Sequence, residues 1–425
     1  TTNLDVVDID GAVDMASTLT VAGNITQTTG DLLYSGGINW DIKHTVAGQN
    51  IVFSTTPSGG STTERFRIAS DGSLSTATAG TSNVRFGVNA GNSITSGGNY
   101  NVVVGDEAGT AITTGDGNTS LGYRALKTAA TSSNNTAIGL SAMELTTTGA
   151  QNTAVGRLSL DALTEGNANV ALGNAALTAD TKGSNSVAVG NAALGAQNFT
   201  SATDSFNTAV GYNAGTSVTT GVQNTLIGGL AGDALVDAHF NTAVGYQALS
   251  TDTESNYNTA IGYRALLVAN NTSSTNGYNV AVGADAGQAV TTALENTLIG
   301  ALAGDAITTG NSNTAVGKSA LSAATTGTLN VAIGKDALRD NTTAAANTAV
   351  GTVSMRLNTT GASNTAVGYG SLDTNTTGGS NVAIGRDSLT ANTTASNNTA
   401  VGYNSLVANT TGTSNVALGA YALDA

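Results

Sequence analysis

The stretch Asn241-Thr-Ala-Val-Gly245 is followed 17 residues later by Asn258-Thr-Ala-Ile-Gly262, and the same pattern recurs through most of the chain. The glycine that closes each string occurs 20 times between Gly87 and Gly419. Of the 19 intervals between these glycines, 16 are 17 residues long, one is 18 and two are 21. A fixed spacing of this kind is typical of repeat proteins, in which each unit packs against its neighbours. The sequence therefore predicts a repeat array over residues 81–425.

The residues before each closing glycine follow strict rules, with that glycine numbered as position 0. Position −1 is apolar in all 20 units, position −3 is always Thr or Val, position −2 is Ala in 15 units, and position −4 is Asn in 19. This pattern is typical of a short strand that ends in a tight bend. We expect positions −1 and −3 to face the interior of the coil. The alanine at −2 should then face outward, where its small size suggests close contact with another copy of the chain.

The side chain at position +4 is linked in size to the one at position +7. Position +4 is Leu or Met in 14 units and Gly in six, and in those six units position +7 is always Ile, Val or Leu. A Leu-sized void in a close-packed interior costs about 2.7–5 kcal/mol. The exchange therefore predicts that every unit encloses the same small cavity, which either position can fill.

These rules predict an all-β fold, a parallel β-solenoid (β-roll) of about 20 seventeen-residue coils. Seventeen residues are too few for two helices, and Gly, Thr and Asn are weak helix formers. We expect two short strands and two turns in each coil, with about 4.8 Å between coils. The Asn at −4 and the Gly at 0 should form columns along the axis, because Asn can bond to turn amides of the next coil and Gly adopts backbone angles closed to other residues. Members of these columns are Asn135, Asn152, Asn241, Asn313, Gly139, Gly156, Gly245 and Gly317.

Residues 1–80 follow different rules. Acidic and apolar residues alternate from Asp5 to Asp14, which is a strand-like period of two, and the only Trp and the only Pro of the chain, Trp40 and Pro57, lie in this segment. An uncapped solenoid end exposes unpaired strand edges. We therefore predict that residues 1–80 form a small β-rich module that caps the solenoid or joins it to a neighbour.

The repeat strings also resemble known families. Strings such as Ser186-Val-Ala-Val-Gly190 and Asn381-Val-Ala-Ile-Gly385 resemble the head repeats of trimeric autotransporter adhesins. The longer unit, Asn-Thr-Ala-Val-Gly-Tyr-x-Ala-Leu followed by Thr-Thr-Gly, is similar to repeats in phage tail-fibre-like proteins and related bacterial extracellular proteins. The resemblance covers about four-fifths of the chain. It implies a left-handed parallel β-roll with three chains side by side, located outside the cell on a virion tail or a cell-surface appendage.

Composition argues against several other functions. The 14 Lys and Arg residues stand against 28 Asp and Glu, and the net charge of −14 is unlike the basic footprint of a nucleic-acid-binding protein. No apolar run approaches the roughly 18 residues of a membrane span. The chain has no Cys, and its two His, His44 and His239, lie in unrelated contexts without a nucleophile motif or a phosphate loop. We therefore expect no catalytic, cofactor or metal site, and no enzyme.

Three columns of residues are candidates for contacts at the surface. Tyr recurs at position +1, where it could stack on sugars or on a neighbouring chain. Asn-Thr-Thr recurs at positions +7 to +9 and matches the N-glycosylation pattern. Regular Thr columns also suggest an ice-binding face, although the four-residue insertions near 195–206 and 267–278 break their register. The tyrosines are Tyr123, Tyr246, Tyr263, Tyr369 and Tyr403, and the candidate glycosylation sites are Asn341, Asn358, Asn375, Asn392 and Asn409.

The sequence as a whole predicts a structural extracellular fibre protein that serves in assembly and surface attachment. We expect the chains to associate with one another as a homotrimer, with a cell-surface glycan as a further candidate partner. One alternative is a bacterial filament whose subunits join head to tail through residues 1–80. Another is a polysaccharide-binding tailspike, although glycan cleavage would require a pair of carboxylates in a groove, and no such pair stands out.

Overall fold

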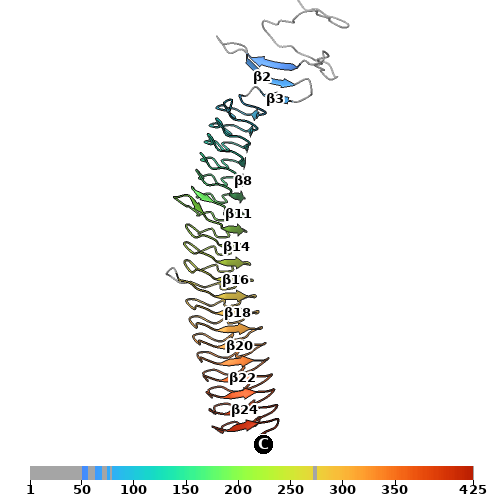
Figure 1. Cartoon of the computed structure of the whole chain (residues 1–425), viewed down its shortest axis with the longest axis vertical. Coiled ribbons are helices and arrows are strands. Elements are labelled where there is room, and N and C mark those ends of the chain that lie inside the picture. Colours follow the sequence, from blue (N-terminus) through green and yellow to red (C-terminus); the bar gives the residue numbers. More distant parts are fainter. Residues whose placement is uncertain (1–49, 56–62, 69–73, 77–78, 271–274, 425) are drawn as a thin grey trace, which may run out of the picture.

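The computed structural model describes residues 50–55, 63–68, 74–76, 79–270 and 275–424. Among these residues the regular elements are all β-strands, and no helix occurs. The chain winds into a long, gently curved rod in which one strand from each coil lies in file along one side (Figure 1). The prediction of an all-β parallel solenoid with 17-residue coils is therefore confirmed.

Twenty three-residue strands make up the long parallel sheet of the solenoid. Each covers positions −3 to −1 of its unit and pairs in register with the strand of the next coil, as Thr242 does with Thr259. The strands are β4 (Val84–Phe86), β5 (Val102–Val104), β6 (Thr119–Leu121), β7 (Thr136–Ile138), β8 (Thr153–Val155), β9 (Val170–Leu172), β11 (Val187–Val189), β13 (Thr208–Val210), β14 (Thr225–Ile227), β15 (Thr242–Val244), β16 (Thr259–Ile261), β17 (Val280–Val282), β18 (Thr297–Ile299), β19 (Thr314–Val316), β20 (Val331–Ile333), β21 (Thr348–Val350), β22 (Thr365–Val367), β23 (Val382–Ile384), β24 (Thr399–Val401) and β25 (Val416–Leu418).

The described part of the N-terminal segment is a separate antiparallel sheet at one end of the rod (Figure 1). It consists of β1 (Ile51–Thr55), β2 (Thr63–Ile68) and β3 (Leu74–Thr76), in that order. The acidic stretch of residues 5–14, Trp40 and Pro57 lie outside the described residues. The capping or joining role of residues 1–80 stays a prediction.

The expectation of two strands per coil was wrong. Beyond the long sheet, the solenoid contains only one short pair in the described residues, β10 (Gly183–Ser184) with β12 (Thr203–Asp204). The rest of each coil takes turn conformations, because non-glycine residues such as Asp336 and Leu338 adopt positive φ, 55° and 49°. This turn side still bonds from coil to coil, as Thr308 N does to Thr325 O at 2.9 Å.

The orientation expected for the strand residues was also wrong. The residue at −2 faces the interior, where Ala243 and Ala260 are fully buried, whereas positions −3 and −1 face outward and are half-buried or exposed. The alanine is small because the opposite wall of the narrow coil already supplies a Leu at +4. The proposed contact between alanines of neighbouring chains is therefore excluded by burial.

Three positions share the interior volume of each coil. The predicted exchange between +4 and +7 is confirmed: a Cβ added to Gly232 would lie 2.8 Å from Leu235 Cδ1. The structure adds position −2 to this exchange. Leu226 at −2 fills the space left by glycine at +4 of its own coil and of the preceding one, because a Cβ on Gly232 or Gly215 would lie 2.7 or 2.6 Å from its methyl groups. Leu298 does the same between Gly287 and Gly304.

The glycines at position 0 form the predicted file. Gly139, Gly156, Gly245 and Gly317 have φ between +136° and +141°. A Cβ on Gly139 would lie 2.4 Å from the carbonyl oxygen of Gly156 in the next coil. Backbone from successive coils therefore meets at a spacing that leaves no room for a side chain.

The asparagines at −4 form the predicted ladder. Asn152 N donates to Asn135 Oδ1 at 2.9 Å, and Asn152 Nδ2 crosses its own coil to Gly166 O at 2.9 Å. Asn241 and Asn313 make the same pair of bonds in their coils. Each buried amide thus ties its coil to the one before and closes its own coil, which satisfies the polar groups of the interior.

The single Ser in this ladder is compensated locally. Ser186 N still donates to Asn169 Oδ1 at 2.9 Å, but its short side chain cannot cross the coil. Gln197 fills the gap, since its Nε2 donates to Ser186 Oγ at 2.8 Å and its Oε1 accepts from Asn207 Nδ2 at 2.9 Å. The ladder of hydrogen bonds therefore continues through the first insertion by way of the Gln197 side chain.

Both four-residue insertions lie on the turn side. Across the first, Val187 still pairs with Thr208, and across the second, Thr259 still pairs with Val280. The long sheet therefore keeps its register through both irregular coils.

Candidate functional site

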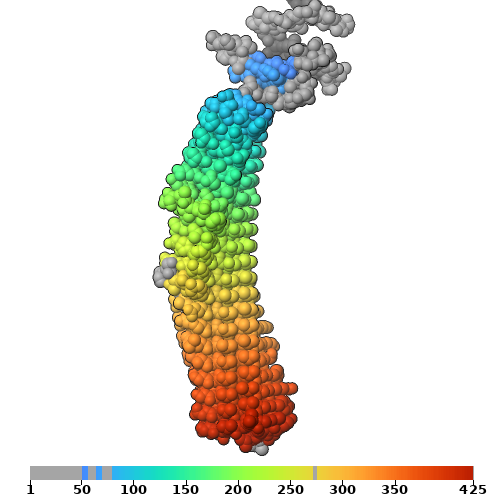
Figure 2. All heavy atoms as spheres, in the orientation of Figure 1, coloured from blue at the N-terminus to red at the C-terminus, as the bar shows by residue number. Residues whose placement is uncertain are grey.

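The outward face of the long sheet is the most regular surface of the molecule. We define this outward face as positions −3 and −1 of its 20 strands. Position −3 is always Thr or Val, position −1 is always apolar, and no strand places a charge at either position. Exposed aliphatic side chains at −1 include Leu121, 45 % exposed, and Ile261, 38 % exposed. The face forms a continuous uncharged strip along the rod, whose layers are visible in Figure 2.

Apolar side chains on such a strip are unusual for a surface in water. All-parallel sheets normally have both faces covered. A three-residue strand is about 10 Å long, and 20 strands at about 4.8 Å span roughly 90 Å. The strip is therefore about 900 Å² with its Thr and Val column included, and its apolar column at −1 runs along all 20 strands; large exposed apolar surfaces mark interaction sites.

The middle of the outward face is ridged. From Val210 to Val350, position −1 alternates strictly between Val and Ile over nine consecutive strands. Ile carries one methylene more than Val, so the partly exposed Ile227, Ile299 and Ile333 extend further from the sheet than the Val side chains between them. The face thus carries a row of ridges and hollows with a period of two coils.

Charged groups lie mainly on the turn side. Arg124 pairs with Glu144 at 2.8 Å and with Glu107 at 3.3 Å, which links three successive coils. Lys127 Nζ lies 2.7 Å from Glu107 Oε2, and this hydrogen bond lowers the pKa of the Glu107 carboxyl. Charge therefore stabilises the solenoid beside the outward face without entering it.

The predicted tyrosine column borders the outward face at one end of the strands. Tyr123, Tyr246, Tyr263, Tyr369 and Tyr403 are between 41 % and 53 % exposed. Tyr246 and Tyr263 stack on each other at 6.0 Å, and Arg124, Arg264 and Arg386 lie over three of these rings, those of Tyr123, Tyr263 and Tyr369. These ring faces are partly covered within the chain, so their role in binding a sugar stays a prediction.

A second aromatic column, at position −5, was missed in the sequence. Phe240, Tyr257 and Tyr278 stack in consecutive coils, with ring centroids 4.8 and 5.3 Å apart. They lie at the opposite end of the strands from Tyr246 and Tyr263. Tabulating position −5 would have revealed them, because the three residues are consecutive members of that column. Mutual stacking occupies the faces of the middle ring and leaves mainly ring edges exposed.

The N-glycosylation prediction was wrong for the buried asparagines at +7. Asn341, Asn358, Asn375 and Asn392 have no exposed surface, and Asn409 is half-buried. Asn358 Nδ2 donates to Gly361 O at 2.9 Å and to Asn341 Oδ1 at 3.2 Å. These amides form a second internal ladder, so the four fully buried side chains are not accessible to a modifying enzyme in the folded chain.

Two buried carboxylates occupy the same +7 column further up the rod. Asp180 accepts from Gln197 Nε2 at 2.6 Å and from Gly183 N at 2.9 Å, and Asp252 accepts from Ser255 N at 3.1 Å. Burial raises the pKa of both carboxyls above the ordinary value for Asp. Each precedes an insertion by one coil, and the two lie four coils apart, so they do not form a catalytic pair.

The described histidine has a structural role. His239 Nδ1 accepts from Val222 N at 3.0 Å, and its Nε2 lies 3.5 Å from Asp237 Oδ1. His44 lies outside the described residues. In the parts of the chain that the structure describes, no group of three or more His, Asp or Glu side chains could hold a metal ion.

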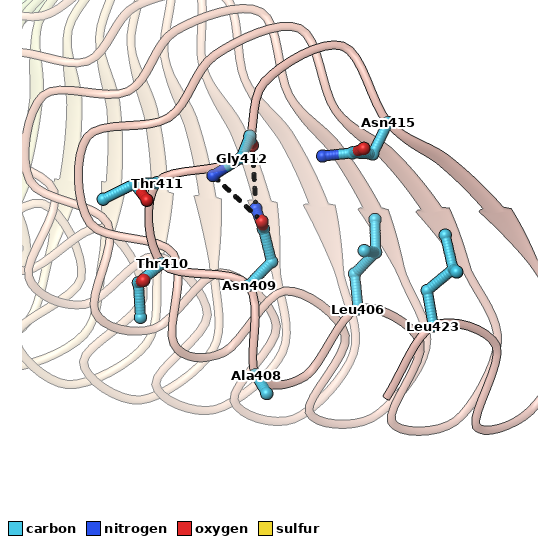
Figure 3. A pocket seen from close by; sticks show the side chains of 8 residues that line it. All are labelled: Leu406, Ala408, Asn409, Thr410, Thr411, Gly412, Asn415 and Leu423. Carbon is cyan, nitrogen blue, oxygen red and sulfur yellow. Dashed lines mark hydrogen bonds between the residues drawn. The ribbon is translucent and has the colours of Figure 1, made fainter. Parts of the chain in front are cut away.

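A hollow at the last described coil is the open cross-section of the solenoid (Figure 3). Leu406 and Leu423 occupy position +4 of successive coils there, and Asn409 Nδ2 donates to Gly412 O at 3.0 Å. The residues that line this hollow occupy the same repeat positions as those inside all the other coils. The hollow therefore offers no chemistry of its own. Within the described residues, no helix is long and apolar enough to cross a membrane.

Comparison with known proteins yields no family model, no curated protein and no solved structure that matches this chain. The resemblance to adhesin heads and tail fibres rests on the repeat strings alone and stays a prediction.

Proposed function

We propose that this chain is a non-enzymatic structural protein, a rigid extracellular fibre segment that holds its two ends at a fixed distance. On this proposal it belongs to a virion tail or a cell-surface appendage, where it contributes to assembly and attachment. The observation that supports the proposal most is the unbroken parallel pairing of 20 strands, which continues through both insertions.

Rigidity follows from the bonding between coils. Backbone pairing on the sheet side, bonds such as Thr308 N to Thr325 O on the turn side and the ladder at −4 all connect each coil to the next. Bending would have to lengthen several of these bonds in the same coil. A rod of this kind resists bending along its whole length, which suits a spacer.

Electron microscopy of the purified chain tests this proposal. The expected particle is a straight or gently curved rod, with a solenoid about 95 Å long for 20 coils at about 4.8 Å each. Removal of residues 318–385, which are four units of 17, joins Gly317 to Arg386 in register. This deletion should shorten the rod by about 19 Å and leave its width unchanged. A flexible or compact particle, or a deletion variant that does not fold, would contradict the proposal.

The same images address the filament alternative. Rods of one fixed length support a fibre segment, whereas polymers of indefinite length support head-to-tail joining through residues 1–80. The homotrimer implied by the resemblance stays a prediction, which sedimentation of the same sample measures.

A further inference from the structure

The outward face combines exposure with a strict demand for apolar residues. At an exposed position of an ordinary soluble rod, Lys, Glu, Ser or Gln would be frequent. None of these occurs at −1 in 20 units, although side chains such as Leu121 and Ile261 are 45 % and 38 % exposed. The turn side of the same coils does accept charge, for example at Arg124 and Glu144. Something other than the fold of one coil therefore restricts position −1.

The spacing of the face limits what can cover it. Side chains at −1 recur once per coil along a line of 20 strands, so a complementary surface must carry side chains at the same spacing over the same length. A second copy of this chain has the same spacing, because it consists of the same coils. Sheets that pack face to face lie about 10 Å apart, with their side chains interdigitated.

The ridges indicate how two copies would fit. Alternation of large and small side chains lets two facing layers interdigitate. Between Val210 and Val350, each exposed Ile is flanked by half-buried Val on both sides. A cyclic assembly about the rod axis would bring equal coils together, with Ile against Ile. A pair of chains registered so that Ile faces Val fills every hollow.

The area agrees with a stable pair. About 900 Å² on each chain gives about 1,800 Å² in total, within the range of specific protein–protein interfaces. The strip carries an apolar column at −1 and a column of Thr and Val at −3, and it is bordered by Tyr246 and Tyr263 at one end of the strands and by Phe240 and Tyr257 at the other. Aromatic residues are enriched in interfaces of this kind.

We propose that two copies of this chain pack through the outward faces of their long sheets, in a register that places each Ile of one ridge opposite a Val of the other. This inference deepens the proposed fibre function and rests on it. It replaces the alanine contact expected from the sequence with a contact made by the residues at −1 and −3.

Sedimentation of a charged variant tests the location of the interface. The unaltered chain should sediment as a dimer at micromolar concentration. The double variant Ile261→Lys, Ile299→Lys should raise the dissociation constant at least 100-fold, because it places two ammonium groups against an apolar layer. The matched control is Leu145→Lys, Leu302→Lys, since these leucines are 48 % and 36 % exposed but lie outside the outward face. The control should remain a dimer, and circular dichroism should show that both variants keep the β structure.

A second variant tests the proposed register, because interdigitated and merely apolar faces predict opposite changes in the stability of the dimer. Val244→Ile, Val282→Ile, Val316→Ile fills three hollows of the ridge. If the faces interdigitate, the added methyl groups collide with the partner and weaken the dimer at least tenfold. If the face is merely apolar, the added methyl groups strengthen the association, and the proposed register is overturned.

The remaining outcomes are equally distinct. A chain that forms rods but stays monomeric overturns the pairing and leaves the proposed fibre function intact, and a monomer that shapes ice crystals would assign the same face to ice instead. A cyclic trimer overturns the two-chain register. A chain that forms no rod at all contradicts the proposed function itself.

Discussion

The two sides of each coil differ in how much variation they accept. The sheet side keeps three-residue strands in register over the whole array and restricts −3 and −1 to Thr, Val and apolar residues. The turn side accepts two insertions, an exchange of Leu for Gly, buried carboxylates and several ion pairs. Both sides bond from coil to coil, so backbone bonding alone does not explain the difference. On the turn side, different residues can fill the interior, whereas the sheet side also restricts its outward residues, and the proposed pairing of two chains would account for this restriction.

The largest effect is expected where backbone meets backbone at the end of the strands. Gly228 has φ +133°, and a Cβ there would lie 2.5 Å from Gly245 O, whereas a Cβ on the adjacent Gly229 would meet only the Tyr246 ring at 3.5 Å. We expect Gly228→Ala to lower the free energy of unfolding by about 4 kcal/mol or more. Gly229→Ala should change it by less than about 0.5 kcal/mol. Chemical denaturation followed by circular dichroism measures both, and equal losses would contradict the file of glycines.

The next largest loss of stability tests whether positions −2, +4 and +7 fill one shared interior volume. Leu226→Ala opens a cavity beside Gly215 and Gly232 and should cost about 3 kcal/mol. Gly232→Leu should partly restore stability in that background when combined with Leu235→Asn, because the coil then has the common set of Ala, Leu and a polar residue. A Leu side chain is compatible with the positive φ required at +4, because Leu249 adopts φ 54° at this position of its own coil.

Thermal unfolding of the single, double and triple variants gives the coupling between these positions. Additive losses would show that the three positions do not share one cavity.

A smaller effect is expected in the ladder of the turn side. Asn358→Ala removes the bonds from Asn358 Nδ2 to Gly361 O and Asn341 Oδ1, and the bond that Asn358 Oδ1 accepts from Asn375 Nδ2. Asn341 Oδ1 loses this donor in the buried interior, whereas Gly361 O keeps its bond from Asn347 Nδ2, and the change should cost about 2 kcal/mol. Thr360→Ala, in the same turn, provides a control with little expected effect. If Asn358→Ala were as stable as the control in a denaturant titration, the side chain would not be part of an internal ladder.

The smallest effect concerns pH. Burial raises the pKa of Asp180 in the folded state, so its contribution to stability is fully present below the unfolded pKa, about 3.9, and is lost as the pH rises through the folded value. We expect the chain to become more stable as the pH is lowered from 7 toward 4. Asp180→Asn should reduce this slope relative to the unaltered chain. Melting temperatures across this range test the comparison, and identical slopes would contradict it.

The sequence alone predicted the features that depend on which residue occupies a single position of the repeat. The glycine file and the ladder through Asn135 and Asn152 follow from residues that recur almost without exception. The direction in which the strand residues face did not follow, because −1 and −2 are both apolar or small. The deciding signal was carried by a few larger residues at −2, Val103, Leu226 and Leu298, which coincide with glycine at +4 in their own and the preceding coil.

Other errors have similar causes. Asn341 and its equivalents match a modification pattern because Asn and Thr are also the residues that form this turn, and only the cross-section of the coil shows that the amides point inward. The second strand was expected because positive φ is uncommon for residues such as Leu338, yet most Leu residues at +4 adopt it. The alternation of Val and Ile at −1 is visible in the sequence. It could be interpreted as a ridge on the surface only after the structure showed that −1 faces outward.

The amide ladder at −4 also has a direction. Except at the step bridged by Gln197, the later residue donates to the side-chain oxygen of the earlier one, as Asn152 does to Asn135 and Asn330 does to Asn313. A coil that emerges from the ribosome therefore finds its acceptors already in place on the coil synthesised just before it. Folding can proceed like a closing zipper during translation, one rung at a time, because no coil has to wait for a distant part of the chain.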